Sequence, residues 1–418
     1  MLRVGMLSLH TCPLAALGGK ETGGMNVYVR EASRELGRMG IQVDVFTRSQ
    51  NPAIPRAVPL GTNCRVVHLS AGPEAPIPRE TVYRHVPEFV ANLEEFAARE
   101  GRGYDLLHAH YWLSGVAGLE LRARWGVPLV QMFHTLGLLK NRAARSAGEL
   151  EPGVRIEEER RILRDGDRIV AANPVERAHL VWYYGAPSER IAIIPCGVDT
   201  EVFRPFDPAE AKAALSLGSE RFLLYVGRLT PIKGLETLLE AVRRLRRHVR
   251  YRDLRLLIAG GDVDEPENGH AAFLTERVRS LGLAGAVSFV GPQPQERLRF
   301  YYSAASITVM PSYYESFGMV ALEAMACASP VIASRVGGLT TTVLDGTTGY
   351  LVPEGDPRAL ADRISVLLDD EGLRWRVGRE ASRLATRYRW PCVAEAICQL
   401  YAQERPAARQ HLSLARCR

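Results

Sequence analysis

Two glutamates, Glu315 and Glu323, flank the start of a predicted helix within residues 312–332. An apolar run at residues 304–309 has the character of a buried strand, and helical spacing of apolar residues begins at Phe317. The first N–H groups of a helix have no backbone partner and carry the positive end of its dipole, so this helix start favours a bound phosphate. Glu315 precedes the helix, whereas Glu323 lies inside it, roughly 8 Å further along at 1.5 Å per residue. The two carboxylates can therefore meet the two ends of one elongated ligand.

Carboxylates beside a phosphate site are consistent with one class of ligand. A carboxylate accepts hydrogen bonds from paired hydroxyl groups of a sugar or a ribose, while the helix start binds the diphosphate between them. The combination predicts a nucleotide sugar. In the alternative interpretation Glu315 only caps the helix and Glu323 is a solvated residue on its exposed face. The residues of this segment alone favour neither interpretation.

Two cations follow another predicted strand, residues 222–226. Arg228 follows the strand after one glycine, Gly227, and Lys233 precedes a second predicted helix that begins near Leu235. Open α/β sheets bind ligands at the carboxyl ends of their strands, and an Arg fork with a Lys point charge suits a diphosphate leaving group. Either cation alone could be a surface salt-bridge partner. Both together, beside the two glutamates, favour a diphosphate site.

A glycine-rich loop, residues 18–26, leads into a helix early in the chain. Gly23 and Gly24 allow close approach of the backbone, and the helix start again favours phosphate. The pattern is not GxGxxG, so the loop is weak evidence by itself. His10 ends the first predicted strand and would face the same crevice.

Histidines end two further predicted strands, in HAHYWLSG at residues 108–115 and in MFHTLGLLKN at residues 132–141. None has an i,i+4 partner or a carboxylate at a metal-ligand spacing, so we expect no metal site. Hydrogen bonding of His134 to sugar hydroxyls fits better. For His108 the alternation of the strand predicts a core position without a functional role.

Composition indicates a soluble protein of more than one domain. Hydrophobic residues make up 46% of the chain and charged residues 24%. Its length of 418 residues exceeds the size at which a single hydrophobic core keeps growing. Seven scattered cysteines without metal-ligand spacing predict a reduced, cytoplasmic protein. Only four of the 53 basic residues are lysines, at positions 20, 140, 212 and 233.

The densest basic run, residues 243–255, could touch anionic lipid or nucleic acid. We interpret it as a solvated helix face, because charge runs of this kind are usually exposed and aromatic residues for stacking on single strands are absent. We therefore expect no nucleic-acid partner. Association with a membrane surface is kept as the weaker alternative.

Strand and helix patterns alternate along almost the whole chain, which predicts parallel, doubly wound α/β sheets. A first series occupies residues 1–200, and a second begins at residue 219 and ends near residue 390. Residues 201–218, rich in Pro, Asp and Ala, are predicted to link two Rossmann-like domains that face each other across a deep cleft. A final helix at about residues 391–405 could return to the first domain.

Four motifs together give a specific family resemblance: GGMNVYV (23–29), PCGVDTEVF (195–203), VGRLTPIKG (226–234) and ESFGMVALEAMACASPVIAS (315–334). Over nearly its whole length the chain resembles the family 4 retaining glycosyltransferases of the GT-B fold. The resemblance implies catalytic roles for Arg228 and Lys233 on the diphosphate and for Glu315 on the donor sugar, with Glu323 on the ribose. It implies donor-binding roles for the following residues: His10, Gly23, Gly24, Phe317, Gly318, Met319, Val320 and Glu323.

Motifs of the first domain resemble D-inositol 3-phosphate glycosyltransferases and, next, sucrose-phosphate synthases. The resemblance implies acceptor-binding roles for Asn26, Arg79, Tyr111, His134, Thr135 and Arg155. At position 79 an arginine stands where those relatives usually have a lysine; the charge is kept, although a guanidinium has a different geometry. The run RIEEERRIL at residues 155–163 leans toward the sucrose-phosphate type, so the acceptor stays open between inositol 3-phosphate and fructose 6-phosphate.

The expected reaction is retaining transfer of glucose or N-acetylglucosamine from a nucleoside diphosphate sugar, with UDP as the expected carrier, to a phosphorylated sugar or cyclitol. No enzymic nucleophile with an adjacent base is evident, so preorganised charge around the leaving diphosphate would carry catalysis without a metal or another cofactor. Three alternatives remain: a pyridoxal phosphate-dependent phosphorylase, for which only Lys233 could form the Schiff base; a non-catalytic carbohydrate-binding module; and a peripheral membrane glycosyltransferase with a lipid-linked acceptor.

Overall fold

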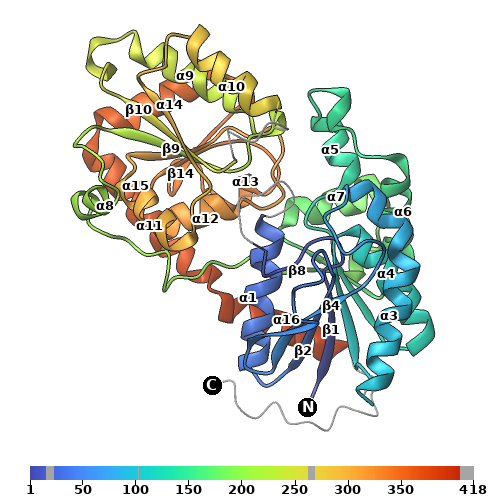
Figure 1. Cartoon of the computed structure of the whole chain (residues 1–418). Coiled ribbons are helices and arrows are strands. Elements are labelled where there is room, and N and C mark those ends of the chain that lie inside the picture. The colour runs from blue at the N-terminus through green and yellow to red at the C-terminus, as the bar shows by residue number, and fades with distance from the viewer. Residues whose placement is uncertain (16–22, 102, 262–268, 405–418) are drawn as a thin grey trace.

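The computed structural model describes residues 1–418 apart from 16–22, 102, 262–268 and 405–418. Two α/β lobes lie next to each other in Figure 1, the first coloured blue to green and the second mostly yellow to orange. Residues 18–22 of the glycine loop lie outside the described residues, as does residue 405 of the predicted last helix. The predicted architecture of two doubly wound domains is confirmed.

The first lobe is built on an eight-stranded sheet with the order β3-β4-β2-β1-β5-β6-β7-β8. Its strands are β1 (Arg3–Leu7), β2 (Gln42–Arg48), β3 (Ala57–Gly61), β4 (Cys64–Leu69), β5 (Leu106–His110), β6 (Leu129–Met132), β7 (Arg168–Ala171) and β8 (Ile191–Ile193). All neighbours pair in parallel except β3 and β4. Every residue of β1 and of β5 is buried, as expected for parallel strands covered on both faces.

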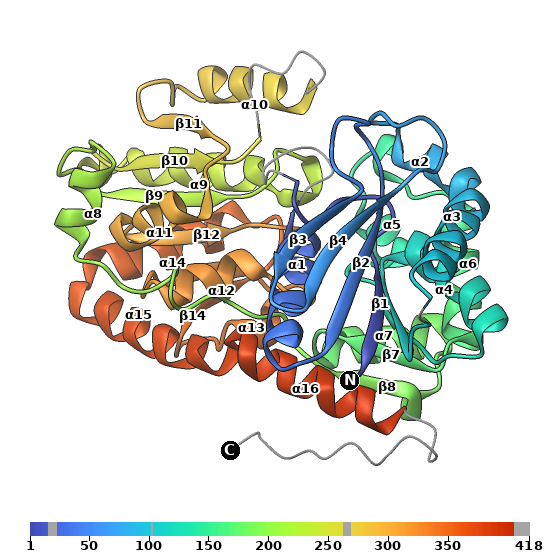
Figure 2. The same cartoon turned by 60° about the horizontal axis from the view of Figure 1, so that its bottom comes forward.

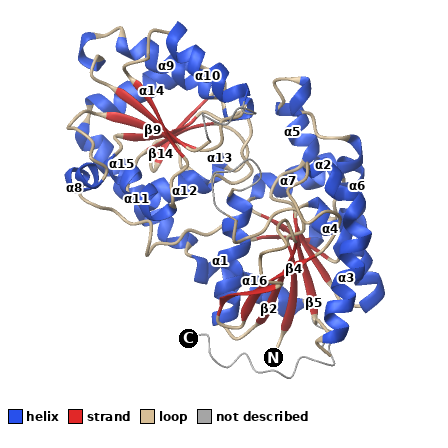
Figure 3. Cartoon of the chain, viewed as in Figure 1, coloured by secondary structure: helices blue, strands red, loops and turns tan. Residues whose placement is uncertain are grey.

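Helices cover both faces of this sheet (Figure 3). They are α1 (Gly24–Arg38), α2 (Arg79–Val82), α3 (Val86–Arg99), α4 (Trp112–Trp125), α5 (Gly137–Ala143), α6 (Gly153–Asp165) and α7 (Pro174–Tyr184). Local sequence fixes their ends: α7 begins where the Asn173 side chain accepts a hydrogen bond from the Glu176 N–H and ends at Gly185 in the left-handed conformation.

The second lobe is built on a six-stranded parallel sheet with the order β11-β10-β9-β12-β13-β14. Its strands are β9 (Phe222–Val226), β10 (Arg255–Ala259), β11 (Val287–Gly291), β12 (Ile307–Met310), β13 (Val331–Ser334) and β14 (Gly349–Val352). Its helices are α8 (Pro208–Ala214), α9 (Leu235–Arg246), α10 (Gly269–Ser280), α11 (Gln295–Ala304), α12 (Met319–Ala326), α13 (Leu339–Thr342), α14 (Pro357–Asp369) and α15 (Glu371–Ala385). Because α8 packs on α11, only the residues before α8 within the predicted linker 201–218 cross between the lobes.

The last helix, α16 (Trp390–Gln403), lies against α1 of the first lobe. Figure 2 shows α15 and α16 along the bottom of the view, leading from the second lobe to the first. The Trp390 ring packs edge-on against Tyr28, with ring centroids 5.5 Å apart. The Tyr401 hydroxyl lies 2.7 Å from Nδ1 of the buried His108. A Cβ atom on Gly197 would lie 2.4 Å from the Trp390 ring, so glycine is required where the helix crosses.

Candidate active site

A cavity opens between the lobes at the carboxyl ends of the strands of both sheets, and nearly all predicted site residues line it. From the first lobe these are His10, Gly23, Gly24, Asn26, Arg79, Tyr111, His134 and Thr135. From the second lobe they are Arg228, Lys233, Glu315, Phe317, Gly318, Met319, Val320 and Glu323. The fold therefore brings together residues that are more than 300 positions apart in sequence, as the carboxyl-end rule for α/β sheets predicts.

The helix start predicted at Phe317 is that of α12, which begins two residues later at Met319. Gly318 precedes it with φ +93°, and a Cβ atom there would lie 2.6 Å from the Leu339 side chain. Only glycine fits this turn without strain. Among the residues that the structure describes, no side chain caps α12, so the interpretation of Glu315 as a helix cap is wrong. The first N–H groups of the helix lie at the cavity that Gly318 and Met319 line.

Lys233 and Glu315 form an ion pair at the cavity wall, with Nζ 2.6 Å from Oε2. The position of Lys233 depends on Gly234, which has φ +68° and whose added Cβ would lie 2.0 Å from the Pro311 carbonyl oxygen. The two residues come from different βα loops of the second sheet, so the pair joins the loop after β9 to the loop after β12.

Glu323 is buried, with 8% of its surface exposed, so the interpretation of it as a solvated surface residue is wrong. Its Oε2 accepts a hydrogen bond of 2.8 Å from the Tyr302 hydroxyl. Burial raises the pKa of the Glu323 carboxyl to about 7, although hydrogen bonds from Tyr302 and Gln295 act in the opposite direction. A buried carboxyl at the edge of the cavity is an apt acceptor for hydroxyl groups.

In the first lobe the glycine loop and Asn26 form the near wall. The Asn26 side chain accepts a hydrogen bond from the Gly23 N–H (3.0 Å) and donates to the Thr11 hydroxyl (2.7 Å) and the Cys12 carbonyl (2.8 Å). Three of its hydrogen-bonding positions are thus used to shape the loop. A Cβ on Gly24 would lie 3.0 Å from the Met319 sulfur of the other lobe, so this glycine allows close contact between the lobes.

The two histidines that line the cavity, His10 and His134, are half-buried, and both have a pKa well below the usual range. Burial, together with Arg79, Arg155 and His134, lowers the pKa of His10 to about 3; burial likewise lowers the pKa of His134 to about 3. Nδ1 of His110 lies 2.9 Å from Nε2 of His134, so His110 orients the cavity-lining ring. Within the described residues, no group of three or more His, Cys, Asp or Glu could hold a metal ion.

Arg155 is the one predicted site residue that does not line the cavity. Its side chain is fully buried and donates to the Tyr111 hydroxyl (3.0 Å), to Thr135 Oγ1 (3.0 Å) and to the Thr135 carbonyl oxygen (2.8 Å). Arg155 therefore reaches the cavity through Tyr111 and Thr135, which line it.

Sequence reasoning missed Lys140, Tyr314 and Gln295, which also line the cavity. Lys140 had a signal, because lysine is rare in this arginine-rich chain. Tyr314 and Gln295 had none, since their partners lie in the other lobe: the Tyr314 hydroxyl accepts from the Leu136 N–H (3.2 Å), and Gln295 Oε1 accepts from Arg30 (2.8 Å).

Further contacts hold the lobes together beside the cavity. Asn173 donates to the Ser316 carbonyl oxygen (2.6 Å), and the Ile232 N–H donates to Glu149 (3.1 Å). Ser316 directly follows Glu315 and Ile232 directly precedes Lys233, so contacts between the lobes fix both neighbours of the ion pair.

Comparison with known proteins identifies the family. The model of "Glycosyltransferase Family 4" matches residues 22–202, and that of "Glycosyl transferases group 1" matches residues 207–384. A D-inositol 3-phosphate glycosyltransferase of Acidothermus cellulolyticus is 42% identical over 98% of this chain and 93% of its own length. The chain belongs to the family 4 glycosyltransferases. A second relative of the same name, from Nocardiopsis dassonvillei, is 40% identical over the whole chain and 97% of its own length.

Solved glycosyltransferase structures share the fold. A sucrose-phosphate synthase from Thermosynechococcus elongatus superposes with a TM-score of 0.89 at 36% identity, covering 96% of this glycosyltransferase and 99% of that chain. WaaG, a glycosyltransferase of lipopolysaccharide biosynthesis, gives a TM-score of 0.70 at 17% identity, covering 96% of this chain and 99% of its own. The protein is thus a transferase of the GT-B architecture.

The basic run 243–255 of this glycosyltransferase lies at the end of α9 and at the start of β10. Ala259, at the other end of β10, lines the cavity, so the run is about 13 Å from the cavity along the strand. Across the described residues, none of the helices combines the length and apolar character needed to cross a bilayer.

Proposed function

We propose that this enzyme transfers a hexosyl group, glucose or N-acetylglucosamine, from a UDP-sugar to a hydroxyl group of a phosphorylated cyclitol, inositol 3-phosphate, with retention of configuration. The observation that carries the proposal is the division of the cavity: the second lobe contributes the Lys233–Glu315 pair, Arg228 and Glu323, and the first lobe contributes the cations Arg79 and Lys140.

The second-lobe wall supports a nucleotide sugar as the donor. Arg228, Lys233 and the start of α12 offer positive charge for a diphosphate, while the carboxyls of Glu315 and Glu323 can accept hydrogen bonds from sugar and ribose hydroxyls. UDP is the carrier that the family resemblance implies.

The first-lobe wall supports a negatively charged acceptor, because Arg79 and Lys140 both line it. The choice of inositol 3-phosphate rests on the names of several relatives at about 40% identity over nearly the whole chain. Fructose 6-phosphate is the second candidate, since the sucrose-phosphate synthase of known structure is 36% identical over a comparable length.

Chemically, the departing diphosphate would itself take the proton of the acceptor hydroxyl on the face from which it leaves. As the bond between the anomeric carbon and the phosphate oxygen breaks, Arg228, Lys233 and the start of α12 would stabilise the growing negative charge. The acceptor oxygen then bonds to the anomeric carbon on the same face, which retains configuration. This scheme requires no metal or cofactor besides the donor, and closed lobes would limit hydrolysis.

A cytoplasmic location is part of the proposal, because both substrates would be small phosphorylated metabolites. A lipid-linked acceptor finds less support, since the basic run 243–255 lies at the end of β10 remote from the cavity.

The test is a screen of the purified enzyme by mass spectrometry, crossing UDP-, ADP- and GDP-sugars with inositol 3-phosphate, fructose 6-phosphate and glucose phosphates. We expect a glycosylated inositol phosphate from a UDP-hexose. Sucrose phosphate as the main product would favour the second candidate, and transfer to none of the phosphorylated acceptors would contradict both.

A further inference from the structure

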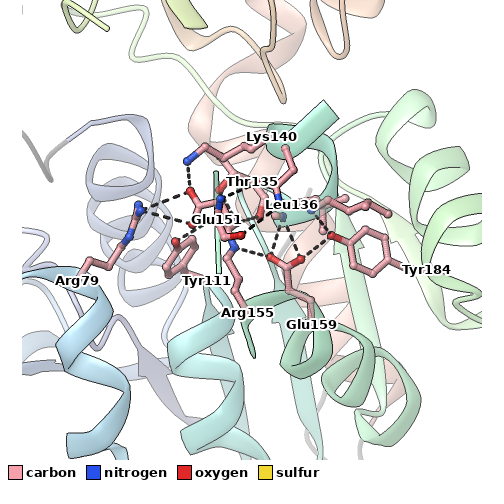
Figure 4. A network of polar contacts seen from close by, with 12 residues as sticks. Arg79, Tyr111, Thr135, Leu136, Lys140, Glu151, Arg155, Glu159 and Tyr184 are labelled. Atoms are coloured by element: carbon pink, nitrogen blue, oxygen red, sulfur yellow. Dashed lines mark hydrogen bonds and ion pairs between the residues drawn. The ribbon is translucent and has the colours of Figure 1, made fainter. Parts of the chain in front are cut away.

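The carboxylate of Glu151 contacts three cationic side chains, which come from the three helices α2, α5 and α6 (Figure 4). Arg79 lies 3.4 Å from both of its oxygens, Arg155 lies 2.8 Å from Oε2, and the Lys140 ammonium group contacts Oε1. The Glu151 side chain is only 3% exposed. Burial alone would raise the pKa of Glu151, but Arg155, Arg79 and Lys140 together lower it to about 2, so the carboxylate stays ionised.

The cluster has a front and a back relative to the cavity. Arg79 and Lys140 line the cavity with side chains 26% and 21% exposed, whereas Glu151 and the fully buried Arg155 lie behind them. A second carboxylate, Glu159, binds Arg155 at 2.7 Å but lies behind the wall as well. Three cations face two carboxylates, and the two cations nearest the cavity share a single carboxylate with Arg155.

The backbone of Glu151 is fixed to the residue next to Lys140. The Asn141 side chain donates to the Glu151 carbonyl oxygen (3.1 Å) and accepts from the Glu151 N–H (2.6 Å). Lys140 and Asn141, both on α5, therefore bind one residue through its side chain and its backbone. Like charges repel, and the Glu151 carboxylate, which contacts both Arg79 and Lys140, offsets the repulsion between these two cations.

We propose that Lys140 acts with Arg79 to hold the anionic group of the acceptor, and that Glu151 is the positioning residue that keeps both cations at one place. The inference rests on the proposed function, since it takes the acceptor to carry a phosphate monoester. Lys140 thereby becomes a specificity residue, because a neutral acceptor of the same shape would gain nothing from it.

The first test measures binding of inorganic phosphate to the UDP-saturated enzyme by calorimetry, for wild type, Lys140→Met and the control Lys212→Met. Lys212 lies on α8 of the second lobe and donates to the Ser219 and Glu220 carbonyl oxygens. We expect Lys140→Met to weaken phosphate binding by about 10- to 100-fold, the size of one lost hydrogen bond to a charged group, and Lys212→Met to leave it unchanged. Equal binding to wild type and Lys140→Met, or none to wild type, would overturn the inference.

The second test asks whether Glu151 acts through Lys140, by a double-mutant cycle. In a Glu151→Gln background, Lys140→Met should weaken phosphate binding by less than about 3-fold, because the lysine is already displaced. Glu151→Asp should restore much of the lysine's effect. Glu157→Gln, at an exposed position of the same helix α6, is the control. The same loss from Lys140→Met in the wild-type and Glu151→Gln backgrounds would show that Glu151 does not position it.

The phosphate-binding tests and the acceptor screen can refute the two hypotheses independently of each other. Phosphate binding that depends on Lys140, in an enzyme that transfers to no phosphorylated acceptor, would refute the proposed function and leave this inference standing. Transfer to inositol 3-phosphate with unchanged kinetics in Lys140→Met would do the reverse.

Discussion

The ammonium group of Lys233 lies 2.6 Å from the carboxylate of Glu315, and both side chains are less than one-fifth exposed. A cation assigned to the diphosphate and a carboxylate assigned to the sugar thus fix each other's position. In the proposed reaction, each side chain would already be in place for its own part of the donor, and fixed charges of this kind contribute most to catalysis.

Replacing either member of this pair should abolish most activity without unfolding the chain. We expect Lys233→Ala and Glu315→Ala each to lower kcat/KM by at least about 100-fold, while the free energy of unfolding changes by about 1 kcal/mol. Steady-state kinetics and urea unfolding measure the two effects, with Lys212→Ala as the control. Near wild-type turnover in either variant would refute the site assignment.

Glu323 should make stability depend on pH. Its native pKa of about 7 exceeds its ordinary value of 4.5, so between these pH values the native state holds a proton that the unfolded state has lost. The stability from this group is therefore present at low pH and is lost as pH rises from about 4.5 to 7. At pH 8 the free energy of unfolding of Glu323→Gln should exceed that of wild type by up to about 3 kcal/mol. At pH 4 the two proteins should have the same stability.

Buried Glu176 also has its pKa raised to about 7 by burial, so the pH dependence of wild type alone does not isolate Glu323. The difference between wild type and Glu323→Gln does, because Glu176 is common to both. A difference that stays constant from pH 4 to pH 8 would argue against a raised pKa at Glu323.

Tyr314 should matter to transfer through its hydroxyl group. Tyr314→Phe leaves the Leu136 N–H of the other lobe without its partner beside Thr135, so we expect kcat/KM for the acceptor to fall about 10-fold. Tyr313→Phe is the matched control, because the Tyr313 hydroxyl contacts Thr237 of its own lobe (3.3 Å). If both variants behaved alike, the contact between the lobes would have no special part in transfer.

The contact of Tyr401 with His108 should matter to stability and not to catalysis. Tyr401→Phe leaves the buried Nδ1 of His108 without its partner 2.7 Å away, which costs about 1–3 kcal/mol. Urea unfolding should show this loss while kcat/KM stays within about 2-fold. Tyr183→Phe, at a partly exposed ring, is the control. A loss of stability of the same size in that variant would mean that the contact of Tyr401 with His108 adds nothing to the free energy of unfolding.

The central strands could be predicted because parallel strands buried on both faces appear as short apolar runs, as at β5 and β9. The hairpin of β3 and β4 was missed. β3 is a mostly exposed edge strand that contains Pro59. Proline has a low propensity for strands, so the sequence of β3 does not predict one.

The residues that line the cavity from the second lobe could be predicted because they are close in sequence to strand ends and helix starts, as Arg228 and Glu315 are. The first-lobe wall of the cavity could be predicted only in part. Arg79 and Glu151 are 72 residues apart, and Leu136 and Tyr314 are 178 apart. No local sequence pattern indicates which distant side chains a fold brings into contact. The contacts of Glu151 with Arg79, Lys140 and Arg155 could therefore be found only in the structure.

The return of α16 to the first lobe has a consequence for how the protein is made. Tyr401 and Trp390 are buried against residues of the first lobe, whereas the second lobe is one continuous stretch from α8 to α15. During synthesis, the second lobe has its whole sequence before the first lobe does. The lobe that leaves the ribosome first is thus the last to be completed. Its surface beside α1 and β5 stays uncovered until α16 has been synthesised.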